Sequence, residues 1–95
     1  MFGWHGRILH LDLKEEKAAE LVVLVIKRYD YHGYNAGKIA GLVARGINSK
    51  RDEIELIVNA ILTELKPGIK EADEMASTVA LETGEKIDIS AAKSE

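Results

Sequence analysis

Apolar residues recur at helical spacing through most of this chain. The clearest helix starts at an N-cap, Asn48 or Ser49, and stops at Lys66-Pro67-Gly68. Leu56 lies off its apolar stripe, so we expect it to face another element or another chain. The stripe follows the i, i+3, i+4, i+7, i+8, i+11 pattern of one helix face and consists of Ile54, Ile57, Val58, Ile61, Leu62 and Leu65.

A longer helix is predicted over residues 13–31. Asp12 and Glu15 have the spacing of a capping box, and the helix formers KEEKAAE follow. The next stretch, LVVLVI (21–26), is apolar on every side of a helix. Such a helix lies either at the centre of its domain or in a contact with a partner chain.

A slimmer helix is predicted over residues 36–46. Ala36, Ala40 and Ala44 recur every fourth residue, with Gly37 and Gly41 beside them. Small residues at this spacing let the backbone of a neighbouring helix come close. We therefore expect the bulky helix 13–31 to pack on the slim helix 36–46.

The two ends of the chain predict strands. Residues 7–13 alternate apolar and polar side chains, which is typical of a strand with one buried face. Residues 70–82 favour a helix followed by a short strand, 86–90, although 78–89 also reads as a hairpin. The prediction is a single α+β domain over 1–95: three or four helices, a small antiparallel sheet formed by the N- and C-terminal segments, and a frayed tail at 91–95.

The amino-acid composition limits the cellular location and the side-chain chemistry that we expect of this protein. The 95 residues hold no cysteine, which excludes disulfides, thiolate metal sites and a thiol nucleophile. The net charge of −3 provides no long-range attraction for nucleic acid or anionic membranes. The longest apolar run is too short to span a bilayer and no signal peptide is visible, so we expect a cytoplasmic protein without a membrane partner. The chain has no glutamine and 31% charged residues, a pattern typical of thermostable proteins.

The stretch 27–38, KRYDYHGYNAGK, holds the candidate contact residues. Aromatic side chains with a polar tip are frequent at interfaces and pockets. Asp30 and His32 could orient one another as a general base or as the beginning of a metal site. The alternative is a helix-terminal turn whose aromatics cover the core. The candidate contacts for a partner or ligand are Tyr29, Tyr31, His32 and Tyr34.

A second hypothesis is nucleic-acid binding. Residues 36–58 have the outline of a helix-turn-helix, with four cations near the joint: Lys38, Arg45, Lys50 and Arg51. Two features disfavour it. The helix that would read the DNA begins with Asp52 and Glu53, which repel phosphates, and its first core residue comes too late for a tight turn.

Metal and phosphate sites find no support in the sequence. The three histidines are far apart and lack the ligand spacing of a zinc site. The glycines recur every fourth residue instead of clustering in a phosphate loop followed by Lys-Ser or Lys-Thr. We predict no cofactor, no metal and no catalytic residue.

The opening GWHGRILHLDL (3–13) resembles the first strand of the tungsten-pterin aldehyde ferredoxin oxidoreductases, which has the pattern Gly-aromatic-x-Gly-basic-Ile-Leu-x-x-Asp-Leu. The cysteines that bind the iron–sulfur cluster of that family are missing, so the resemblance implies no cofactor or activity. In size and composition the whole chain resembles the short proteins of unassigned function in hyperthermophilic archaea.

These features favour a non-enzymatic binding or self-assembly module. We expect a homo-oligomer that associates through helix 13–31, Leu56 and the tyrosines of 27–38. The alternative is a small nucleic-acid-binding protein of the helix-turn-helix type.

Overall fold

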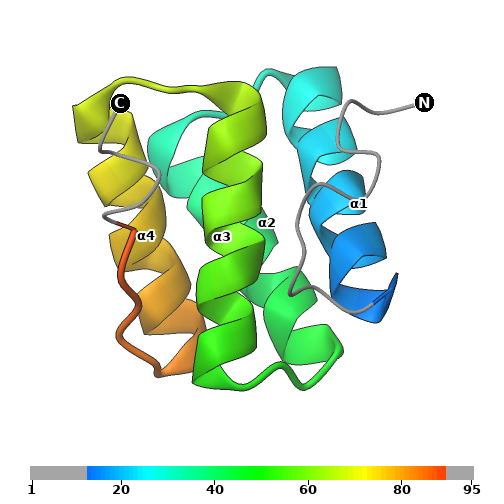
Figure 1. Ribbon diagram of the computed structural model, residues 1–95. Coiled ribbons are helices and arrows are strands. Elements are labelled where there is room, and N and C mark those ends of the chain that lie inside the picture. Colours follow the sequence, from blue (N-terminus) through cyan, green and yellow to red (C-terminus); the bar gives the residue numbers. More distant parts are fainter. Residues whose placement is uncertain (1–12, 90–95) are drawn as a thin grey trace.

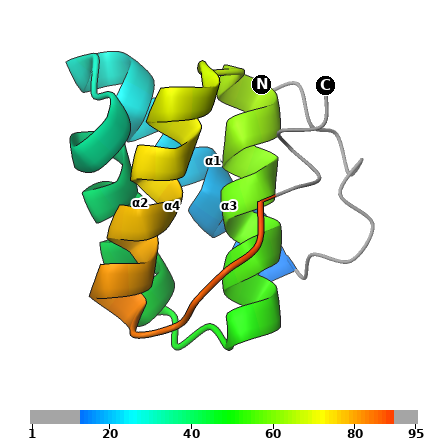
Figure 2. The same ribbon diagram turned by 90° about the vertical axis from the view of Figure 1, so that its left-hand side faces the viewer.

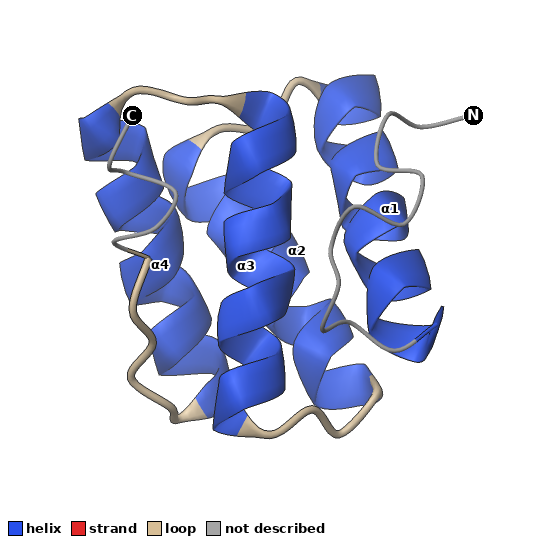
Figure 3. Ribbon diagram, viewed as in Figure 1, coloured by secondary structure: helices blue, strands red, loops and turns tan. Residues whose placement is uncertain are grey.

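Four helices make up most of the part of the chain that the structure, a computed structural model, describes, residues 13–89. They alternate in direction along the chain and pack as a bundle (Figures 1 and 3). Their bounds are α1 Leu13–Tyr29, α2 Gly33–Gly46, α3 Arg51–Leu65 and α4 Ile69–Thr83.

Left-handed residues end three of the helices. Asp30, with φ 56°, follows α1, and the Tyr31 N–H donates to the Ile26 carbonyl over 3.0 Å, as in a Schellman turn. Lys66 ends α3 and Gly84 ends α4 in the same conformation. The first helix therefore ends two residues before the predicted position, and the second begins at Gly33 instead of residue 36.

The core is shared by all four helices. Its bulk comes from branched side chains of α1 and α3, whereas α2 contributes alanines. The largest fully buried side chains are Val22, Val23, Ile54, Ile57, Val58, Ile61, Met75 and Val79. The predicted apolar stripe of the third helix is thus confirmed as a core face, and Leu56 is half-buried beside it.

The closest helix contact joins α2 to α4. A Cβ added to Gly37 would lie 2.7 Å from the Met75 carbonyl oxygen, and one added to Gly41 would lie 2.5 Å from the Glu82 Cβ. At Gly33 an added Cβ would overlap the Glu74 carboxylate. Gly37 thus allows the backbone of α2 to approach that of α4, and Gly33 and Gly41 leave room for the side chains of Glu74 and Glu82.

The expected packing of the bulky helix 13–31 on the slim helix 36–46 needs correction, because neither helix is the main packing partner of the other. Helix α2 contacts α1, but its most extensive contact is with α4, and α1 packs more extensively on α3 than on α2. The small-residue pattern does predict a close approach. It carries no information about which helix supplies the partner backbone.

The predicted α+β fold is wrong, because residues 13–89 contain no strand and no sheet. Residues 85–89, which we call the strap, instead run along α3 (Figure 2). The Asp88 N–H donates to Glu55 Oε2 over 2.9 Å, and the Asn59 amide donates to the Asp88 carbonyl over 3.0 Å. Two side chains of α3 thus provide the backbone partners that a strand would provide, so the predicted strand 86–90 does not form.

The alternation of Ile87 and Ile89 has another cause. Ile89 is buried and Ile87 packs against the core, so both isoleucines of the strap attach it to the bundle. The hairpin alternative for 78–89 is also wrong, because α4 continues to Thr83. The predicted strand over residues 7–13 and the opening segment with its resemblance lie outside the described residues except for Leu13, which begins α1. The tail at 91–95 lies outside the described residues entirely.

None of the helices in the described part of the chain is long and apolar enough to cross a membrane.

Replacing Gly37 with Ala tests the close contact between α2 and α4. We expect the free energy of unfolding to fall by about 1–3 kcal/mol, because the new methyl overlaps the backbone of α4 and not a movable side-chain tip. Urea denaturation monitored by circular dichroism measures it. Gly46→Ala is the matched control in the same helix, since its added Cβ meets nothing within 4 Å. Equal stability of Gly37→Ala and Gly46→Ala would contradict the close contact.

Candidate functional site

The junction between α1 and α2 is a tight turn that presents aromatic side chains. The rings of Tyr29 and Tyr31 stack, with centroids 5.6 Å apart and planes at 24°. Tyr29 and Tyr34 are exposed over 60% and 54% of their surface, whereas Tyr31 packs partly against the core. The junction therefore combines a core lid, Tyr31, with two aromatics that are free to meet a partner.

His32 lies between two carboxylates at this junction. Its Nε2 is 3.1 Å from Asp30 Oδ1, and its Nδ1 is 3.9 Å from Glu71 Oε1 on α4. All three groups are open to water. Among residues 13–89 no group of three histidine or acidic side chains is arranged to hold a metal ion. The predicted orientation of His32 by Asp30 is thus present.

Helix α1 exposes an apolar surface on the side away from the core. Leu21 and Leu24 are exposed over 50% and 52% of their surface, and the exposed Leu13 lies about two turns before Leu21 on the same side of the helix. Lys17 and Arg28 complete the spacing of i, i+4, i+7 and i+11, which places all of these residues on one side of the helix. We call these five residues the α1 face.

The leucines of the α1 face show how the LVVLVI segment, residues 21–26, is oriented in the bundle. Val22, Val23 and Ile26 point into the core, and the two leucines between and before them point out. Helix α1 lies at the edge of the bundle, not at its centre (Figure 1).

Two cations of α2, Lys38 and Arg45, form ion pairs with one carboxylate of α4, that of Glu82. Arg45 Nη1 lies 2.9 Å from Glu82 Oε1, and Lys38 Nζ lies 3.3 Å from Glu82 Oε2. Hydrogen bonds from Arg45 and Lys38 hold the pKa of the Glu82 carboxyl below its ordinary value. The hydrogen bond to Glu82 raises the pKa of Lys38, with a smaller contribution from Tyr34. The two cations therefore brace the contact between α2 and α4.

The other two candidate nucleic-acid contacts lie at the start of α3. Lys50 is the N-cap residue, and its backbone N–H donates to Glu53 Oε1 over 2.8 Å. Arg51 pairs with Asp52 and with Glu55, at 3.6 and 3.2 Å. Three of the four predicted cations are thus engaged by carboxylates. Nucleic-acid binding stays a prediction, and no contact in residues 13–89 adds to it.

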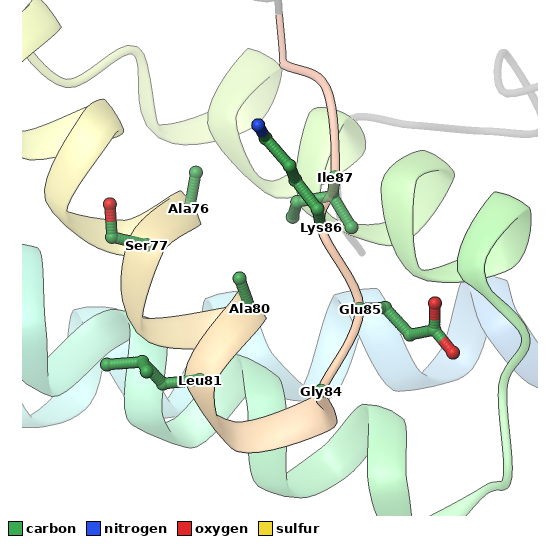
Figure 4. Close-up of a pocket in the computed structure, with 8 residues that line it drawn as sticks. All are labelled: Ala76, Ser77, Ala80, Leu81, Gly84, Glu85, Lys86 and Ile87. Atoms are coloured by element: carbon green, nitrogen blue, oxygen red, sulfur yellow. The ribbon is translucent and has the colours of Figure 1, made fainter.

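A groove runs between α4 and the strap (Figure 4). It is open to solvent, mostly apolar, and has a volume of about 680 Å³. Leu81, beside it on α4, is exposed over 84% of its surface, more than any other large apolar residue of the described chain. The residues that line the groove are Ala76, Ser77, Ala80, Leu81, Gly84, Glu85, Lys86 and Ile87.

Sequence reasoning missed both the outward leucines of α1 as a defined face and the whole groove. The spacing from Leu13 to Arg28 was visible, and separating it from the core positions would have identified the face. No sequence signal shows the groove, because it exists only where the strap folds back beside α4. The predicted contacts Tyr29, Tyr31, His32 and Tyr34 do lie together at one end of the bundle.

Comparisons with protein-family models, with curated proteins and with solved structures find no match to this chain.

The ion pairs of Glu82 predict an acid-sensitive contribution to stability. Because the folded state lowers the pKa of Glu82, this contribution is complete above the ordinary value of 4.5 and disappears as the pH falls through the lowered pKa. Wild type should therefore exceed Glu82→Gln in thermal midpoint at pH 6, and the difference should shrink towards pH 3. The raised pKa of Lys38 has the opposite sign, so its contribution is lost only as the pH rises above 10.5.

Glu74→Gln is the control for this measurement, because Glu74 lies on the same helix without an ion pair to another residue of the described chain. A difference between wild type and Glu82→Gln that stays constant from pH 3 to pH 6 would contradict the electrostatic bracing of α2 and α4.

Proposed function

We propose that the protein is a non-enzymatic self-assembly module whose copies associate through the α1 face. The observation that carries this proposal is the exposure of Leu21 and Leu24 on a helix whose opposite side is fully packed. Contiguous exposed apolar surface on a soluble protein commonly marks an interaction site. Burying a leucine completely contributes about 1.5–3 kcal/mol, so two or three leucines supply a substantial part of a micromolar affinity.

The aromatic junction supports the same proposal. Tyr29 and Tyr34 are exposed at the end of α1 and the start of α2, next to the end of the α1 face. Tyrosine is enriched at protein interfaces because it adds apolar contact area while its hydroxyl still forms hydrogen bonds. The stack of Tyr29 on Tyr31 limits the freedom of the ring, which reduces the entropy lost on binding.

The proposal predicts self-association that depends on Leu24. Wild type should show a concentration-dependent increase in mass in sedimentation velocity between about 1 and 500 μM, the range where a micromolar contact populates oligomers. Leu24→Glu should weaken the association about tenfold or more, because it places a charge in the buried contact. Its circular dichroism should match wild type, since the side chain lies outside the core.

The matched control is Thr63→Glu, which introduces the same charge at an exposed position of α3 away from the α1 face. It should associate like wild type. A wild-type protein that stays monomeric up to 500 μM would refute the proposed function.

A further inference from the structure

We infer that the contact is head-to-tail: the α1 face of one copy binds the groove between α4 and the strap of the next copy. This inference rests on the proposed function and names the second surface. Two of the exposed apolar regions of the described chain lie on different helices, Leu21 and Leu24 on α1 and Leu81 with its groove on α4. One contact that joins the two regions removes both from water.

The shapes of the two regions are complementary. The groove has small residues on its α4 side, Ala76, Ser77 and Ala80, with Gly84 at its end (Figure 4). Leu24 and Leu21 project from a convex helix. Side chains that project from one helix pack best where the neighbouring surface carries small residues that leave space.

The charges of the two sides are also complementary. The α1 face carries two basic side chains, Lys17 and Arg28, and no acidic one. Helix α4 and the strap, residues 69–89, carry two basic and six acidic side chains. Opposite net charges on the two surfaces favour their encounter and disfavour pairing of a surface with its own copy.

The alternative, two α1 faces packed on one another, brings like charges together. With the helices antiparallel and centred between Leu21 and Leu24, Lys17 of one copy lies opposite Arg28 of the other. With the helices parallel and in register, each cation lies opposite its own counterpart. Neither Lys17 nor Arg28 has an ion-pair partner among residues 13–89 that would offset the repulsion.

A contact between two different surfaces leaves one of each free at the ends of any assembly. Copies therefore continue to add until a ring closes or a filament grows, whereas a symmetric contact stops at a dimer. The occupant of the groove in this assembly is the α1 helix of a second copy.

Mixing two variants tests the inference. Leu24→Glu disrupts the α1 face and leaves the groove intact. Leu81→Lys disrupts the groove and leaves the α1 face intact. Each alone should associate about tenfold or more weakly than wild type. Mixed in equal amounts, they should form a 1:1 heterodimer with an affinity near that of the wild-type contact, because each supplies the surface that the other lacks. Sedimentation velocity with one variant fluorescently labelled measures both, and circular dichroism confirms that each is folded.

Three results would overturn the inference. Leu81→Lys that assembles like wild type shows that the groove is not used, and the proposed function survives through a symmetric α1 contact. A mixture that stays monomeric, when both variants are folded, also refutes the head-to-tail contact. Wild type that never associates removes the proposed function together with the inference.

Discussion

The close approach of α2 and α4 is the constraint on which the rest of this structure depends. Gly37 lets the two backbones come together, Gly33 and Gly41 leave room for glutamate side chains of α4, and Glu82 ties that contact to Lys38 and Arg45. Because α2 contributes only small residues, the volume of the core has to come from α1, α3 and Met75 and Val79 of α4. The bulky side of α1 therefore turns inward towards α3, and its remaining leucines are left on the outside.

The same arrangement separates the charges of the molecule. Helix α1 exposes Lys17 and Arg28 beside its leucines, whereas α3, α4 and the strap are acidic, so two exposed apolar regions lie on sides of opposite charge. The strap completes the acidic side, because its attachment to Glu55 and Asn59 forms the wall of the groove. A polarised surface of this kind suits assembly in one direction better than symmetric pairing.

The sequence predicted the helices well and the segment after α4 poorly. The apolar period of residues 54–65 and the stop at Lys66 determine α3 locally, and the structure confirms both. Ile87 and Ile89 alternate as in a strand, but the groups that hold the strap are the side chains of Glu55 and Asn59, about thirty residues away. An isolated period of two does not distinguish a ladder of backbone partners from side-chain partners. The candidate tyrosines were found because their residue types are informative, whereas the groove depends on tertiary packing that no local pattern encodes.

The central claim, that α1 of one copy lies against α4 and the strap of another, is tested most directly by paramagnetic NMR on a mixed sample. The chain has no native cysteine, so Glu20→Cys places a single spin label beside the α1 face. One copy carries the label and a second, unlabelled copy is enriched in ¹⁵N. If the contact is head-to-tail, amide signals of the ¹⁵N copy broaden at residues 76–87. Broadening centred on residues 17–28, or at no residue of the ¹⁵N copy, would contradict it.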